Sequence, residues 1–284
     1  MIGEREFRAK AADGEIVGWL NEVPGKPNAL LLHGGPGMSE YLDTLVAELD
    51  GLFTTARYQQ RGLAPSVVSG DISIEGHIAD GVAVLDALGW DKPTVIGHSW
   101  GGHFALHFAV AQPERVGRLV ILDTLGAVGD GGIAEFGPNL LRGLSDAARD
   151  RLADLDAQEE NGEPLSEEER REHLGLLWPN YFGDPTSAPP MPYMRFGRAD
   201  ETWLSIMAHF KSVTLEHTLP TVTVPTLVIH GGKSPIPVAE AEKIVALMPN
   251  ARLVVHEGKG HWPWLEEPGF ARRLLADFVV VNTD

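Results

Sequence analysis

The feature that most constrains the fold of this chain is a short glycine-rich turn, Gly97-His98-Ser99-Trp100-Gly101-Gly102. Residues 93–96 before it are mostly β-branched and predict a strand, whereas residues 103–111 after it are good helix formers. A serine on so sharp a turn needs glycine neighbours, because a Cβ at Gly97 or Gly101 would clash. The turn therefore predicts a nucleophile elbow with Ser99 as the reactive group. A strand–helix turn that carries a serine by chance is the alternative.

The rest of the chain alternates between short apolar runs and segments of helical periodicity. Residues 7–23 predict a hairpin around Asp13-Gly14. Further strands are expected at 29–32, 53–58, 118–123, 224–230 and 252–255, and helices at 38–49, 72–88, 238–248 and 270–279. Such alternation predicts an α/β fold with a mostly parallel sheet covered by helices on both faces. A chain of 284 residues is long enough for one large domain or a domain with an insertion.

The alternation stops at residues 126–219, which are first glycine-rich, then charged and helical, then rich in proline and aromatic residues. We interpret this stretch as an inserted, mainly helical cap on a core made of residues 1–125 and 220–284. Four of its aromatic residues are candidates to line a substrate pocket: Trp178, Tyr181, Phe182 and Tyr193. A small core for the insertion itself explains the same aromatic residues equally well.

Composition excludes several classes of function. The net charge of −17 argues against a nucleic-acid partner and against an anionic membrane surface. The absence of cysteine excludes thiol catalysis and Cys-zinc sites. The charged start of the chain predicts no signal peptide, so a cytoplasmic protein that acts on a small molecule, as a monomer or homodimer, is expected. No glycine pattern for a nucleotide cofactor follows a strand. His77 and Asp80 lie one helical turn apart but form no metal site on their own, so surface or capping polarity is expected there.

The elbow, together with the loop His33-Gly34-Gly35-Pro36-Gly37, resembles the α/β-hydrolase fold family, and most closely its proline iminopeptidase (peptidase S33-like) branch. The resemblance covers nearly all of the chain outside 126–219 and implies an eight-stranded sheet. It also implies that Ser99 is the nucleophile and His261 the general base, with the backbone N–H groups of Gly35 and Trp100 forming an oxyanion hole. His33 is expected to hold its loop by hydrogen bonds rather than to act as a base.

The acid of the triad is where this chain departs from the family pattern. The position at which the family usually carries an aspartate, three residues after Gly231, is Ser234. A serine cannot stabilise an imidazolium by its charge. Some members of the fold take the acid from the end of the preceding strand, which here is Asp123. Glu257, Glu240 and a dyad without an acid are the alternatives.

The resemblance implies a serine hydrolase that needs no metal or cofactor and cleaves a small ester, lactone or amide through an acyl-enzyme. A dehalogenase or epoxide hydrolase would need an aspartate at position 99. Three alternatives are a proline iminopeptidase-type aminopeptidase, a cofactor-free lyase or oxygenase on the same scaffold, and a weakly active small-molecule receptor.

Overall fold

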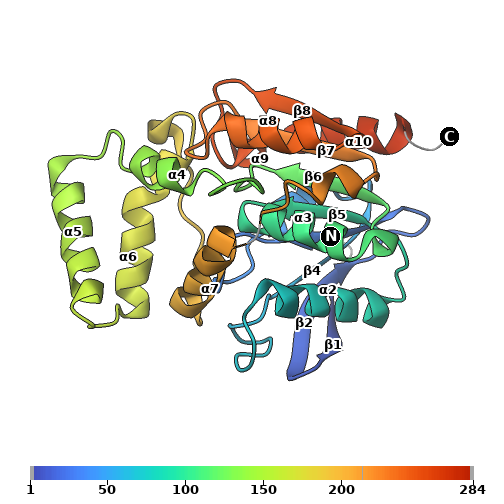
Figure 1. Ribbon diagram of the computed structural model, residues 1–284, viewed down its shortest axis with the longest axis horizontal. Coiled ribbons are helices and arrows are strands. Elements are labelled where there is room, and N and C mark those ends of the chain that lie inside the picture. The colour runs from blue at the N-terminus through green and yellow to red at the C-terminus, as the bar shows by residue number, and fades with distance from the viewer. Residues whose placement is uncertain (1–2, 213, 282–284) are drawn as a thin grey trace.

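A computed structural model describes residues 3–212 and 214–281 and contains one eight-stranded sheet between two layers of helices (Figure 1). The strands are β1 (Arg5–Ala11), β2 (Gly14–Asn21), β3 (Asn28–Leu32), β4 (Thr54–Tyr58), β5 (Thr94–His98), β6 (Arg118–Leu122), β7 (Thr226–Gly231) and β8 (Ala251–His256). The α-helices are α1 (Asp43–Glu48), α2 (Ile74–Leu88), α3 (Trp100–Ala111), α4 (Ile133–Leu140), α5 (Asp146–Glu160), α6 (Glu167–Leu177), α7 (Ala199–Ser212), α8 (Val238–Leu247), α9 (Pro263–Glu266) and α10 (Phe270–Val281).

The strand order is β1-β2-β4-β3-β5-β6-β7-β8. The β1–β2 hairpin and the β2–β4 pair are antiparallel, and every pair from β4–β3 to β7–β8 is parallel. The prediction of a mostly parallel α/β sheet is thereby confirmed. In a parallel sheet the carboxyl ends of the strands meet at one edge, which here brings together the residues that follow β3, β5, β6 and β7.

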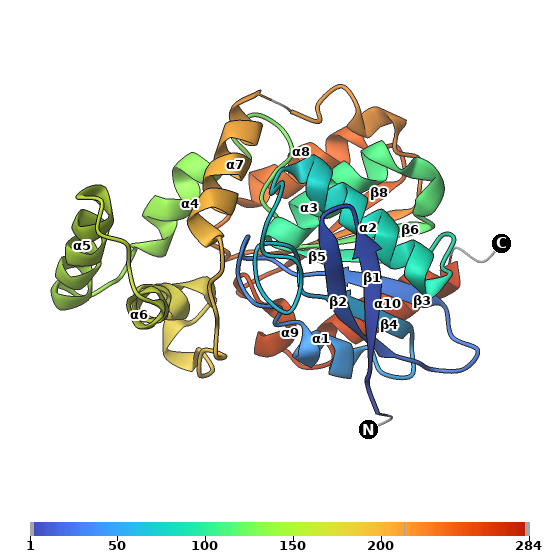
Figure 2. The ribbon, with the colours of Figure 1, turned by 90° about the horizontal axis from the view of Figure 1, so that it is seen from below.

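Helices cover both faces of the sheet, as Figure 2 shows, with α2, α3 and α8 on one face and α1, α9 and α10 on the other. The strand residues alternate between the two cores: Leu30 and Leu32 pack with the first group and Leu31 with the second. All three are buried. Central strands with two buried faces read as continuous apolar runs, which is why the sequence pattern identified them.

Most predicted elements are present, and the start of α2 follows the capping rule: the Ser73 hydroxyl accepts a hydrogen bond from the Gly76 N–H at 3.2 Å. The helix predicted at 38–49 is shorter than expected, since α1 begins at Asp43. Met38 instead pairs as an isolated bridge with Phe196 of the inserted segment. This tertiary contact outweighs the local helical pattern.

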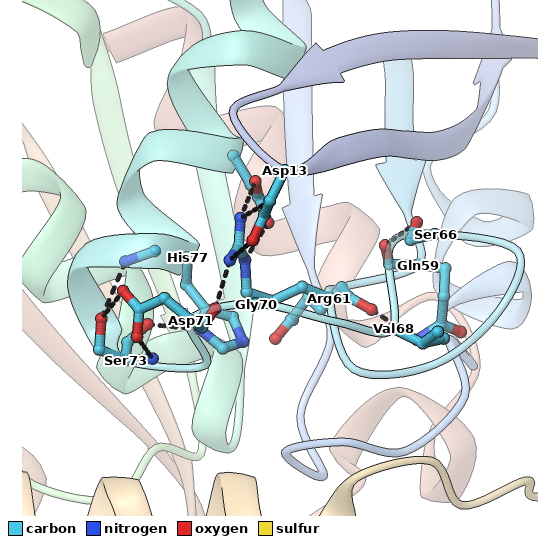
Figure 3. Close-up of polar contacts among 12 residues, drawn as sticks. Asp13, Gln59, Arg61, Ser66, Val68, Gly70, Asp71, Ser73 and His77 are labelled. Atoms are coloured by element: carbon cyan, nitrogen blue, oxygen red, sulfur yellow. Dashed lines mark hydrogen bonds and ion pairs between the residues drawn. The ribbon is translucent and has the colours of Figure 1, made fainter.

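The prediction of surface or capping polarity for His77 and Asp80 is wrong, because both side chains are buried. Asp80 accepts two hydrogen bonds of 2.7 Å from Arg61, which also contacts Asp13 in the β1–β2 turn. His77 Nδ1 lies 2.8 Å from the Ser73 carbonyl oxygen. Figure 3 shows how Arg61 links the loop after β4 to that turn and to the start of α2. A buried charge is stable only when it is paired, and Arg61 supplies the partner.

The stretch 126–219, called here the inserted segment, lies between β6 and β7 and extends to one side of the sheet (Figure 1). It carries α4 to α7 and short 3₁₀ turns at Trp178–Tyr181 and Pro185–Ser187, and a third turn, Leu219–Thr221, begins at its last residue. Within the described residues, no helix is both long and apolar enough to cross a membrane.

Candidate active site

Ser99 occupies the tight turn between β5 and α3, with φ 57° and ψ −126°. Residues other than glycine rarely adopt a positive φ, and the surrounding glycines make the turn possible. A Cβ at Gly97 would lie 2.1 Å from the Gly101 carbonyl oxygen, and one at Gly101 would lie 2.0 Å from the Leu32 carbonyl oxygen. The structure therefore gives Ser99 the geometry of a nucleophile elbow, and α3 starts at the next residue.

Asp123, directly after β6, lies beside His261. The Nδ1 atom of His261 is 2.6 Å from Oδ1 of Asp123, and both side chains are buried. The same carboxylate accepts hydrogen bonds from the Ser234 hydroxyl at 2.5 Å and from the Gly231 N–H at 2.7 Å. Asp123 itself has a positive φ of 42°. This strained backbone and the three donors fix the carboxylate against the imidazole.

The environment of Asp123 keeps it ionised. Burial acts to raise the pKa of its carboxyl, but the nearby His230 and His261 rings and the hydrogen bonds from His261 and Ser234 outweigh burial. Together they lower the pKa of Asp123 to about 2. A carboxylate held ionised against Nδ1 fixes the imidazole tautomer and leaves Nε2 to exchange a proton.

The other acid candidates lie in different surroundings. Ser234 occupies the family's acid position but acts as a hydrogen-bond donor to Asp123. Glu257 is exposed, and Glu240 is buried beside the 126–132 loop, where it accepts from Lys243 at 2.6 Å. Of these candidates, the structure brings Asp123 to His261.

A chain of buried hydrogen bonds joins three parts of the site. The Gly34 N–H donates to the Tyr41 hydroxyl oxygen at 2.8 Å, and that hydroxyl lies 2.7 Å from His98 Nδ1. His98 Nε2 lies 2.9 Å from the His261 carbonyl oxygen. A carbonyl only accepts, so His98 carries its proton on Nε2, and the Tyr41 hydroxyl donates to Nδ1. Burial lowers the pKa of His98 well below its usual value and keeps the ring neutral.

The two predicted oxyanion-hole residues, Gly35 and Trp100, both border the pocket that contains Ser99. Gly35 has a φ of 61°. Its loop is tied down by His33, whose Nε2 accepts from the Gln60 N–H at 3.2 Å. Gln60 in turn accepts from the Trp100 indole at 3.1 Å. The expectation that His33 holds its loop agrees with these contacts.

A pocket of about 280 Å³ opens above Ser99 and His261. It is lined by Gly35, Pro36, Met38, Tyr41, Ser99, Trp100, Leu125, Phe136, Arg170, Leu174, Trp178, Tyr181, Met194, Phe196, Ala199, Asp200, Trp203, His261 and Trp262. Core loops supply one wall and the inserted segment supplies the other. The wall is mostly apolar, which suits a small organic ligand.

Two of the four predicted pocket residues line this pocket and two do not. Trp178 and Tyr181 belong to its wall. The Tyr181 carbonyl oxygen accepts a hydrogen bond of 2.6 Å from the backbone N–H of His261. Phe182 points into the apolar core beneath and is 2% exposed. Tyr193 is 71% exposed and lies under Arg171. Sequence alone did not distinguish these four aromatic residues, because only the fold decides which way each ring faces.

The charged side chains of the pocket wall belong to an ion-pair group that sequence reasoning missed. Arg170 on α6 contacts Asp200 on α7 through two hydrogen bonds, of 2.6 and 2.5 Å, and Glu159 on α5 at 3.2 Å. Tyr41 and the role of His98 were also missed. His98 stands inside the elbow motif, whereas nothing in the sequence indicates that Tyr41 reaches it.

Comparisons with known proteins agree with this architecture. Residues 29–268 match the alpha/beta hydrolase fold family. A 2-hydroxy-6-oxononadienedioate/2-hydroxy-6-oxononatrienedioate hydrolase of Dechloromonas aromatica is 30% identical, with 96% of this chain and 93% of that protein covered.

Two solved structures share the fold. The Mycobacterium smegmatis proline iminopeptidase superposes with a TM-score of 0.69 at 21% identity, over 96% of this chain and 97% of that one. The enol-lactonase from Burkholderia xenovorans LB400 superposes with a TM-score of 0.66 at 19% identity, over 96% and 100% of the two chains.

Proposed function

Because this chain belongs to the alpha/beta hydrolase fold family and is a hydrolase, we propose that it cleaves a small, uncharged carboxylic ester or lactone by way of an acyl-enzyme. In this proposal Ser99 is the nucleophile, His261 the general base, and Asp123 the acid that orients His261. The inserted segment acts as the cap that shapes the substrate pocket.

The observation that carries the proposal is the 2.6 Å contact between His261 Nδ1 and Asp123 Oδ1, at the edge of the pocket that Ser99 also borders. A hydrolase needs a base whose tautomer is fixed and whose positive charge is stabilised as it forms. Asp123 meets both needs in a buried setting. A receptor that only binds its ligand would gain nothing from this arrangement.

The proposed steps use residues of this chain alone. Ser99 Oγ attacks the carbonyl carbon as Nε2 of His261 takes its proton, and the N–H groups of Gly35 and Trp100 stabilise the oxyanion. The proton then passes from His261 to the departing alcohol oxygen, and the C–O bond breaks. Water attacks the acyl-enzyme with His261 again as base, which releases the acid and restores Ser99.

The charge of the pocket wall supports an uncharged substrate. Arg170 is the cation there, and it is already paired with Asp200 and Glu159. A substrate carboxylate would have to displace these partners, and desolvating another anion next to two carboxylates is costly. The remaining wall residues, such as Leu174 and Trp178, suit an apolar acyl or alcohol group.

Labelling with a fluorophosphonate probe tests the nucleophile. We expect the Ser99→Ala variant to lose labelling and hydrolysis, because the probe reacts only with an activated serine. Ser145→Ala, which alters an exposed serine at the start of α5, is the matched control and should label fully. Persistent labelling of the Ser99→Ala protein would remove Ser99 from the mechanism.

A substrate panel tests the class of bond. The wild type should hydrolyse p-nitrophenyl esters of short acids and a neutral lactone faster than proline p-nitroanilide. A strong preference for the anilide would favour the aminopeptidase alternative.

A second candidate is hydrolysis of a dienedioate, as the names of the curated relatives indicate for those proteins. Adding 2-hydroxy-6-oxononadienedioate to the panel separates the two. Its turnover above that of the esters would show that the Arg170 ion pairs open to receive a carboxylate.

A further inference from the structure

Three histidines lie together where the nucleophile helix α3 meets α7. His103 and His107 are one turn apart on α3, and His209 comes from α7 of the inserted segment. Figure 2 shows α7 beside α3. One ligand nitrogen from each ring lies within 4.8 Å of the other two. His103 and His107 are buried and His209 is half-buried. No step proposed above uses any of the three.

The geometry matches the requirements of a zinc ion. Zn²⁺ binds imidazole nitrogen at about 2.0–2.1 Å, which puts two tetrahedral ligand nitrogens about 3.3 Å apart. The Nε2 atoms of His107 and His209 are 3.3 Å apart and share a hydrogen bond. One of the two therefore carries a proton, which moves to Nδ1 of the same ring when both nitrogens bind an ion. The ligand nitrogens of the three rings lie within 4.8 Å of one another, so the largest nitrogen–nitrogen distance has to shrink by about 1.5 Å at most. Rotation of the imidazole rings can supply this movement.

His103 is already in the tautomer that a metal needs. Its Nδ1 lies 2.9 Å from the Gly126 carbonyl oxygen, so Nδ1 carries the proton and Nε2 presents its lone pair. That Nε2 is buried and has no hydrogen-bond partner among the described residues. A backbone carbonyl that holds the remote nitrogen is the usual support of a metal-binding histidine. A buried polar atom without a partner is costly, and a metal ion would satisfy it.

We propose that His103, His107 and His209 form a zinc site that fastens α7 of the inserted segment to α3 of the core. Three histidine ligands leave a fourth position for water. In this proposal the ion joins the helix that begins after Ser99 to the helix that carries the pocket residues Ala199, Asp200 and Trp203. Its test does not depend on hydrolysis, so its failure and the failure of the proposed function are separate.

Zinc titration of the chelator-treated full-length protein tests the site. We expect one equivalent of Zn²⁺ to bind and to raise the thermal unfolding midpoint by several degrees, since an ion that binds only the folded state stabilises it. His209→Gln should weaken zinc binding by about 100-fold or more, because even an outer partner of a ligand is worth 10- to 100-fold. His173→Gln, which alters a histidine on α6 whose ring contacts Asp156 on α5, is the control and should bind zinc like the wild type.

Wild type without a bound equivalent, or equal binding by the His209→Gln and His173→Gln variants, would overturn the proposal. X-ray absorption of the zinc-loaded wild type gives an answer that needs no substitution. Three imidazole ligands are expected there, and one or none would overturn the proposal even if a variant failed to fold.

Discussion

The core sheet and the helices α5 and α6 of the inserted segment are stabilised in different ways. In the core, the central strands are buried on both faces, and residues such as Leu31 and Ile121 are 0% exposed. In the inserted segment, α6 has no buried residue, and α5 buries only Leu152 and Leu155. Ion pairs such as Arg151–Glu172 cover the contact between these two helices. Buried apolar area stabilises far more than exposed pairs do, so the core is the more stable region.

The contrast separates two tasks. The segments that follow β5, β6 and β8 hold the proposed catalytic residues Ser99, Asp123 and His261, where small displacements would cost activity. The inserted segment supplies Arg170, Leu174 and other side chains of the opposite pocket wall. A weakly packed region can change its side chains without unfolding the core. We therefore expect changes in the core to affect rate and stability, and changes in the inserted segment to affect substrate choice.

The largest effect should come from the acid. Asp123→Asn removes the charge that orients and stabilises His261, and we expect turnover of the preferred ester to fall about 10,000-fold. Glu257→Gln alters an exposed carboxylate four residues before His261. It is the control and should change turnover little. Steady-state kinetics of both variants are the measurement. The reverse order of effects would make Glu257 the acid.

Unfolding at acid pH measures how much the ionised Asp123 contributes to the free energy of unfolding. The pKa of Asp123 is lowered from 3.8 to about 2 in the folded protein. A lowered pKa stabilises the fold above pH 4, and this contribution is lost as the pH falls from about 4 through 2. We expect it to be about 2 kcal/mol. Urea unfolding at pH 5 and pH 2 should therefore show a steeper loss in the wild type than in Asp123→Asn. Parallel losses would contradict the prediction.

The tyrosine network should give a moderate effect. Tyr41→Phe leaves the Gly34 N–H and His98 Nδ1 without their shared partner, at a cost of about 1–3 kcal/mol in the free energy of unfolding. Because the network reaches His261, kcat should fall more than KM rises. Tyr58→Phe is the matched control, since the buried Tyr58 hydroxyl has no hydrogen-bond partner within the described part of the chain. Equal effects of the two variants would show that the network adds nothing.

A smaller effect is expected in the pocket wall of the inserted segment. Leu174→Ala enlarges the pocket on the side of the inserted segment, and we expect KM for a longer acyl ester to rise about tenfold. Turnover of an acetyl ester at saturation should stay the same. A large drop in kcat for both esters would mean that the inserted segment also holds the catalytic groups in place.

The smallest effect should come from an exposed ion pair. Arg151→Ala removes the contact to Glu172 between α5 and α6, where both side chains are about 40% exposed. Screening by water leaves such pairs little energy, so neither the unfolding midpoint nor the ester kinetics should change measurably. A clear loss of stability would show that the two regions are less different than their packing suggests.

Much of the fold followed from local patterns. The apolar runs predicted the parallel strands, and Ser73 and Gly89 marked both ends of α2. The start of α1 was not predictable, because it depends on the pairing of Met38 with Phe196, which is distant in sequence. The burial of Asp80 depends in the same way on Arg61. The spacing of His103 and His107 was visible in the sequence, but their nearness to His209 was not.

The sequence by itself determined the elbow, because the sterics of Gly97, Ser99 and Gly101 are local, and it determined the order of strands and helices through their periodicity. Only the tertiary structure decided which carboxylate meets His261, which aromatic rings face the pocket, and that three histidines converge. The physical reason is that each of these depends on contacts between side chains far apart in the chain, and such contacts leave no periodic trace in the sequence.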